Sequence, residues 1–122
     1  MFIRDLIKCK EITAGDNTIL RELFNPEKDD LNLRYSLALA IVKPGKTTLS
    51  HRMQSSEVYY IIQGTGKMFI DDEIENVRPG HAIYIPPLSI QKIENNGSDD
   101  LIFLCIVDPA WKPEDEEVLN NL

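Results

Sequence analysis

The sequence predicts an all-β fold, an antiparallel barrel or sandwich of about eight to ten short strands. Two observations carry this prediction. Apolar and polar or small residues alternate with a period of two over residues 31–42, which is typical of a strand. Short apolar stretches then follow one another to residue 107, separated at regular spacing by turns that contain Gly, Pro or Asn. We find no internal repeat or low-complexity segment.

Length and composition indicate one domain over residues 1–122, with a core that needs no disulfide. The net charge of −7 and the scattered basic residues argue against nucleic acid and anionic membranes as partners. Two isolated cysteines, Cys9 and Cys105, fit a reducing compartment, with a single disulfide as the alternative. The N-terminus has no long apolar run, and no stretch is long enough to span a bilayer. We therefore expect a cytoplasmic protein.

The elements follow in order. Residues 1–24 are weakly patterned, residues 25–30 form a polar loop, and residues 31–42 form a long strand that ends at Lys43-Pro44-Gly45. Further strands are expected at residues 57–62, 67–71, 74–77, 81–85, 90–95 and 101–107. Residues 113–122 are expected to form a short C-terminal helix or a tail, because Pro113 suits a first helical position and the following acids suit the positive end of the helix dipole.

The stretch from Gly45 to Gly64 carries the clearest chemical signal. Alternate residues of a strand share a face, so His51 lies with Met53, and Glu57 lies with Tyr59. If these two faces meet inside a sheet structure, an imidazole and a carboxylate converge on one cavity. A carboxylate among apolar neighbours needs a partner, which favours a polar site there.

Two motifs in the chain resemble those of the cupin superfamily. The first motif is matched by Gly45, His51, Glu57 and Gly64, with Met53 in place of a second histidine. The second is matched by Pro79-Gly80 and the strand that leads to Pro86, with His81 for an aspartate, Gln91 for a third histidine, and Asn95. The resemblance spans about residues 31–107 and implies a double-stranded β-helix, or jelly-roll barrel.

The resemblance also implies a divalent metal held inside the barrel by three histidines and a glutamate. Only His51 and Glu57 match those ligands here. Met53 and Gln91 occupy the other two positions with different chemistry, so the predicted metal set is His51, Glu57 and Gln91, completed by water. Such an oxygen-rich set favours manganese, iron or zinc, with nickel and copper as further candidates.

Each residue also has a structural interpretation. Glu57 could form a salt bridge with Arg52 or Lys92, Gln91 could be a hydrogen-bonding wall of the pocket, and Met53 is more readily explained as an apolar lining residue. His81 follows a Pro-Gly turn, where it would brace the loop. We expect Tyr59 to contact a ligand through its hydroxyl group or to hydrogen-bond to Glu57. Trp111 is expected to pack over the barrel end or a subunit contact.

Three functional hypotheses follow. The leading one is a protein that binds a divalent metal in the barrel and, through it, a small polar metabolite such as a sugar or organic acid, with isomerase or oxygenase as candidate activities. The alternative is a metal-free small-molecule-binding barrel without catalysis. A structural or regulatory partner domain is the third, and nothing appended to the barrel supports it. A homodimer is also expected, with residues 1–24 packed on a second barrel.

Overall fold

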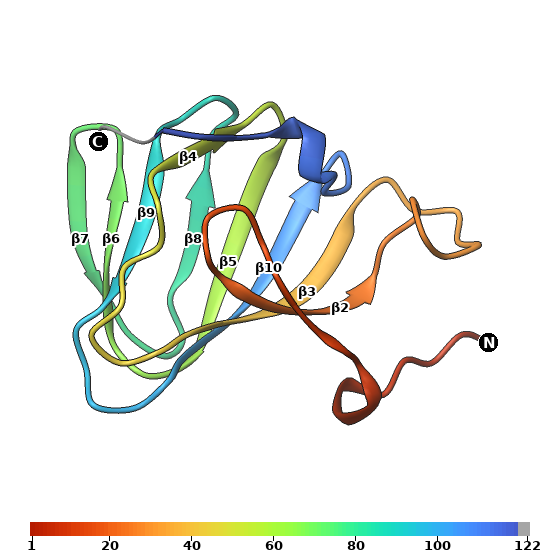
Figure 1. Ribbon diagram of the computed structural model, residues 1–122, viewed down its shortest axis with the longest axis horizontal. Helices are drawn as coiled ribbons and strands as arrows, with labels where there is room; N and C mark the ends of the chain where they lie inside the picture. The colour runs from red at the N-terminus through yellow and green to blue at the C-terminus, as the bar shows by residue number, and fades with distance from the viewer. Residues whose placement is uncertain (120–122) are drawn as a thin grey trace.

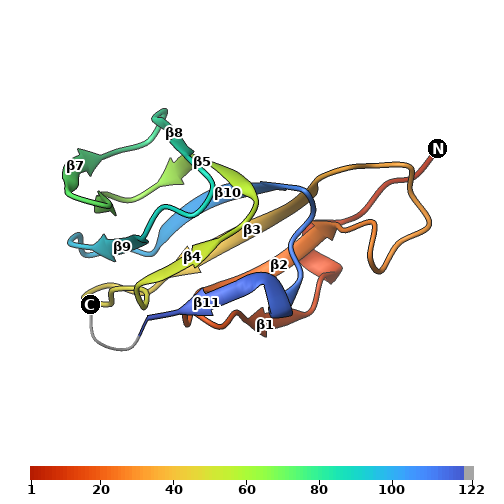
Figure 2. The same cartoon turned by 90° about the horizontal axis from the view of Figure 1, so that it is seen from above.

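The computed structural model describes residues 1–119, which form two antiparallel sheets packed face to face. The larger sheet has the strand order β1-β2-β3-β10-β5-β8, and the smaller one has the order β11-β4-β9-β6-β7. Figures 1 and 2 show the two layers from the side and from above, with β9 and β4 of one sheet across from β10 and β3 of the other. The predicted all-β jelly-roll fold is therefore confirmed.

The strands are short and separated by tight turns. Their bounds are β1 (Glu11–Thr13), β2 (Ile19–Phe24), β3 (Ser36–Val42), β4 (His51–Met53), β5 (Ser56–Gln63), β6 (Gly66–Ile70), β7 (Glu73–Val77), β8 (Ala82–Ile85), β9 (Gln91–Asn95), β10 (Leu101–Asp108) and β11 (Glu116–Val118). Two single turns of 3-10 helix, η1 (Leu6–Lys8) and η2 (Pro113–Asp115), complete the described elements.

The strand predicted over residues 31–42 begins only at Ser36. The buried face of this strand is also not its more hydrophobic one. The small residues Ala38 and Ala40 face the interior and are buried, whereas Leu37, Leu39 and Ile41 point outward and are half-buried. Small side chains on the inner face leave room between the sheets for larger groups from the opposite strands.

The core lies between the sheets, where Ile61 and Phe103 of the larger sheet and Ile93 of the smaller one are almost completely buried. Strands β4 and β9 of the smaller sheet are paired through His51 and Gln91. Strand β5 of the larger sheet carries Glu57 and Tyr59 at alternate, inward positions. The topology thus brings the predicted polar residues to one region of the interior.

The C-terminal segment differs from the expected helix. After η2 the chain continues as β11, which pairs with β4 and so extends the smaller sheet. Pro113 and the two acids after it form only a single 3-10 turn. The turn ends there because the pairing of β11 with β4 requires an extended backbone from Glu116 onward. Residues 120–122 of the predicted C-terminal segment lie outside the described residues.

Both cysteines, Cys9 and Cys105, are free thiols, so the disulfide alternative is not realised here. Among residues 1–119, no helix has the length and apolar character needed to cross a bilayer. His81 lies after the turn that joins β7 to β8, where its Nδ1 accepts a hydrogen bond from the backbone N–H of Arg78 at 3.2 Å. This contact braces the turn.

Candidate functional site

A chain of hydrogen bonds connects three buried polar side chains inside the barrel. The Tyr59 hydroxyl donates to Oε1 of Gln91 at 3.0 Å, and Nε2 of Gln91 donates to Oε1 of Glu57 at 2.5 Å. The three residues are only 5%, 2% and 4% exposed, respectively. The structure therefore brings together Glu57, Tyr59 and Gln91, which the sequence predicted as neighbours.

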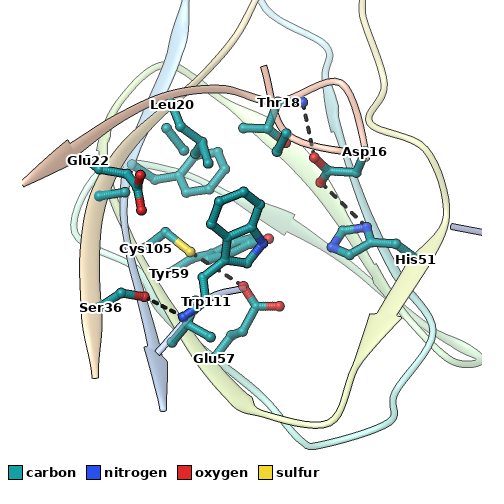
Figure 3. A pocket seen from close by; sticks show the side chains of 15 residues that line it. Asp16, Thr18, Leu20, Glu22, Ser36, His51, Glu57, Tyr59, Cys105 and Trp111 are labelled. Carbon is teal, nitrogen blue, oxygen red and sulfur yellow. Dashed lines mark hydrogen bonds and ion pairs between the residues drawn. The ribbon is translucent and has the colours of Figure 1, made fainter. Parts of the chain in front are cut away.

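Next to this chain lies a cavity of about 40 Å³. Figure 3 shows its fifteen lining residues, which come mainly from β2, β3, β5 and β10 and include His51, Glu57 and Tyr59. The lining combines apolar residues such as Ala38, Ala40 and Phe103 with polar ones, and Figure 3 shows Glu22 and Ser36 across the pocket from Asp16 and His51. A space of this size holds a few water molecules at most.

The imidazole of His51 is held in one orientation. Its Nδ1 lies 3.0 Å from the backbone oxygen of Leu49 and 3.4 Å from Oδ2 of Asp16. A carbonyl oxygen can only accept, so Nδ1 carries a proton and donates it. In the neutral ring the other nitrogen, Nε2, then has a free lone pair, and in Figure 3 it points toward the pocket.

Burial shifts the protonation of three groups in the site. Removal from water raises the pKa of the Glu57 carboxyl, and the nearby His51 and the hydrogen bond from Gln91 only partly oppose this rise. Burial, followed by the charge of Glu57, raises the pKa of both Tyr59 and Cys105 well above their ordinary values. Tyr59 and Cys105 are therefore neutral hydrogen-bond donors at physiological pH.

Met53 lies away from this group. Its side chain is buried, but it lines a different hollow together with Leu88 and the acidic residues 114 and 115. The salt-bridge interpretation of Glu57 is also not realised among the described residues. Arg52 instead pairs with Glu117 at 2.8 Å, and the Lys92 ammonium lies over the Phe69 ring.

Four residues of the site were not predicted from the sequence. Asp16 contacts His51, the Cys105 thiol donates to Oε2 of Glu57 at 3.4 Å, and the Trp111 indole N–H donates to Oε2 of Glu116 at 2.9 Å. Cys105 pairs in register with Tyr59 across β10 and β5, so its inward position follows from the alternation. Asp16, Trp111 and Glu116 lie in irregular or short segments, where no alternation along the sequence predicts which way a side chain points.

The predicted metal ligands His51, Glu57 and Gln91 are not arranged in this structure to hold a divalent ion tightly. Both oxygens of Glu57 already accept hydrogen bonds, from Gln91 and from Cys105. Gln91 turns its amide N–H, rather than its oxygen, toward Glu57. Among residues 1–119, no group of three His, Cys, Asp or Glu side chains is placed to hold a metal.

Comparison with known proteins identifies the family. A sequence model described as the cupin domain matches residues 38–107. An uncharacterized protein of Methanocaldococcus jannaschii is 42% identical over 113 residues, which is 92% of this chain and 90% of that protein. Glucose-6-phosphate isomerase of Pyrococcus furiosus is 25% identical over 111 residues, and the match covers 80% of this chain but only 59% of the isomerase.

Solved structures agree on the fold. A protein of Photorhabdus luminescens superposes with a TM-score of 0.76 at 27% identity, over 94% of this chain and 91% of its own. A cupin 2 conserved barrel domain protein of Salinispora arenicola superposes with a TM-score of 0.73 at 18% identity, over 93% of this chain and 91% of its own.

Proposed function

The chain belongs to the cupin domain family, and from this premise we propose that it binds a small, neutral, hydroxylated molecule of the sugar class in the barrel pocket. The observation that supports this proposal is the buried chain formed by Tyr59, Gln91 and Glu57. Tyr59 and Glu57 of this chain line the pocket, and a phenol and a protonated carboxyl can each donate to and accept from the hydroxyl groups of a ligand.

The charge of the pocket favours a sugar over the organic acids that the sequence also suggested. The described lining includes the acids Asp16, Glu22 and Glu57 but no lysine or arginine. A carboxylate ligand would find no lysine or arginine in this lining to pair with, whereas a neutral hydroxyl group needs none. The name of the isomerase relative refers to a phosphorylated glucose, and only the neutral sugar part of such a molecule suits this lining.

The small cavity implies that the ligand enters by displacement. Trp111 lines the pocket and is only half-buried, and it follows the last long strand rather than lying within a sheet. A sugar ring is larger than a cavity of about 40 Å³. We expect the Trp111 indole to move aside and then to cover one face of the bound ring.

The test is a ligand titration with a matched pair of variants. Glucose and mannose are compared with oxalate and succinate by isothermal titration calorimetry. We expect at least one sugar to bind, and Tyr59→Phe to weaken it about three- to tenfold through the loss of one hydrogen bond. Tyr84→Phe, on the outer side of β8, serves as the control. Binding of the acids alone, or equal affinity in all three proteins, would contradict the proposal.

A metal-holding form is the second candidate, and the free Nε2 of His51 is the observation that favours it. His51, Glu57 and Gln91 would hold manganese, iron or zinc after Gln91 turned its amide oxygen inward. A divalent ion would supply a Lewis acid for the isomerase or oxygenase activity considered above. The proposal of sugar binding does not depend on it.

Metal analysis separates the two forms. Untagged wild-type protein and His51→Ala are dialysed against manganese, iron or zinc at low micromolar concentration and measured by mass spectrometry. The metal-holding form predicts close to one equivalent in the wild type and little in the variant. Equal, near-zero metal in both proteins would rule it out and would leave the sugar titration unaffected.

A further inference from the structure

A second and much larger hollow lies at the side of the molecule, between the last strand of each sheet. β7 ends the smaller sheet and β8 ends the larger one, and Figure 2 shows both strands on the same side. The hollow has a volume of about 550 Å³, against about 40 Å³ for the pocket, and its lining comes from residues between 68 and 86. We call it the β7–β8 groove. It shares no lining residue with the pocket, so the proposed function does not use it.

Each wall of the groove is a strand with one free edge. Among residues 1–119, β7 pairs only with β6, and β8 pairs only with β5. Alternate residues of an edge strand turn their backbone N–H and C=O groups away from the sheet, where another strand can pair with them. Charged side chains normally protect such edges, but β8 carries no charge over Ala82–Ile85, and its residues Ala82 and Tyr84 are exposed. β8 therefore offers an open edge to an additional strand.

The opposite wall carries negative charge on the face that a sandwich usually fills with apolar side chains. Glu73 and Glu75 of β7 lie in register with Ile70 and Met68 of β6, so these two acids point toward the other sheet. Both are exposed, and neither forms an ion pair with another residue of the described chain. Asp71 adds a third acid, and the lining contains no lysine or arginine. The groove therefore has an unneutralised negative wall.

The floor between the two walls is apolar. Met68 is 3% exposed, and Ile70 and Ile83 are partly buried against the same core. This combination suits lysine and arginine, because their aliphatic stems cover apolar surface while their charged ends reach an acid. Tyr84, which is 62% exposed, adds an aromatic ring over which a cation can lie.

We propose that the β7–β8 groove binds an extended peptide segment of a partner protein, with lysine or arginine at alternate positions. The segment pairs with the free edge of β8 and directs its basic side chains toward Glu73 and Glu75, since alternate side chains of a strand share a face. A strand as short as β8 spans about 13 Å, so it engages a segment of about four to six residues.

The acids of β7 decide which occupant the groove accepts. A second copy of this chain, with its net charge of −7, would bring the same acids against Glu73 and Glu75. Inward-pointing charges of this kind oppose edge-to-edge pairing between copies. A basic segment meets opposite charge instead, so the side chains that exclude a second copy favour the partner.

Fluorescence anisotropy of a labelled hexapeptide of alternating lysine and valine tests the proposal on the full chain. We expect saturable binding to the wild type, weakened about tenfold or more by Glu75→Lys, which reverses a charge in the groove. Glu114→Lys makes the same change at an exposed position outside the groove and should bind within about twofold of the wild type. Circular dichroism establishes that each variant is folded. An absence of binding to the wild type, or equal affinity in the two variants, would overturn the proposal.

Strand pairing is tested separately from charge, on the wild-type protein alone. The same peptide with D-residues at alternate positions keeps its charge but cannot form a regular strand, and spermine carries positive charge without a peptide backbone. We expect neither to displace the labelled peptide, and we expect amide hydrogen exchange in Ala82–Ile85 to slow only when the L-peptide is bound. Displacement by either compound would show that the groove responds to positive charge alone. That result, or unchanged exchange in β8, would contradict the proposed strand pairing.

Discussion

Glu57 is an acid that the fold keeps away from water, and its stability contribution should depend on pH. Because burial raises its pKa, the native state favours the protonated form. That contribution is fully present below the pKa of an unfolded glutamate, about 4.3, and is lost as the pH rises through the higher native pKa. Glu57→Gln, which cannot ionise, should therefore melt above the wild type at pH 8, by on the order of 3 °C, with the gap closing toward pH 4.

Thermal unfolding between pH 4 and pH 8 measures this gap. Glu116, whose pKa is also raised by burial, is present in both proteins and cancels in the difference. Glu73→Gln on the exposed side of β7 is the control and should track the wild type at every pH. A gap that is constant across the range would show that packing, and not ionisation, separates Glu57→Gln from the wild type.

Asn95 is a second buried polar residue, with a purely structural role. It is 1% exposed, and its amide donates to the backbone oxygens of Val42 and Asp99, both at 2.8 Å, while its oxygen accepts from the N–H of Gly97. Asn95→Ala leaves these groups without a partner, and we expect a loss of about 2–4 kcal/mol in the free energy of unfolding. Urea denaturation measures it, with the exposed Asn96→Ala as a control expected within about 0.5 kcal/mol of the wild type.

At the scale of elements, substitutions at two glycines in turns distinguish the energetic cost of backbone strain from that of a steric clash. Gly45 and Gly64 both have a positive φ, of 74° and 84°. A Cβ on Gly45 would meet nothing within 4 Å, whereas one on Gly64 would lie 2.7 Å from the backbone oxygen of Asp100. Gly45→Ala should destabilise the protein by about 1 kcal/mol from strain alone, and Gly64→Ala by clearly more. Equal losses in urea denaturation would mean that the β5–β6 turn yields to the added methyl group.

The strands were predictable where local pattern and turn chemistry agree. Strands β5 to β10 lie within a few residues of the expected stretches, because proline and glycine mark their ends. The pattern was less informative for β3, whose alternation is clear but whose inner face is the less hydrophobic one. The extended backbone after Pro113 was missed because its pairing partner, β4, lies about 65 residues earlier in the chain.

At the scale of the whole molecule, the site was predictable only in part. Motif spacing predicted a site at His51, Glu57 and Gln91, and strand alternation added Tyr59. The structure joins Glu57, Gln91 and Tyr59 by hydrogen bonds. Asp16 and Trp111 reach the same pocket from opposite ends of the chain. Only the assembled fold sets their positions, so periodicity within one segment cannot reveal them.

At the same scale, the single tryptophan offers a direct report on the pocket. Trp111 is the only tryptophan of the chain and lines the pocket, so its fluorescence should change when a sugar enters. An unchanged spectrum at a sugar concentration that saturates the calorimetric titration would contradict this prediction.

The pairing of β11 with β4 has a consequence for the order in which the protein is made. Strand β4, which carries His51, pairs with β9 through His51 and Gln91 and with β11 along its whole length. During synthesis, residues 116–118 leave the ribosome long after β4 does. Strand β10, which joins β3 to β5 in the larger sheet, is also made late. Neither sheet is therefore complete, and the pocket is not closed, until residues 101–118 are available.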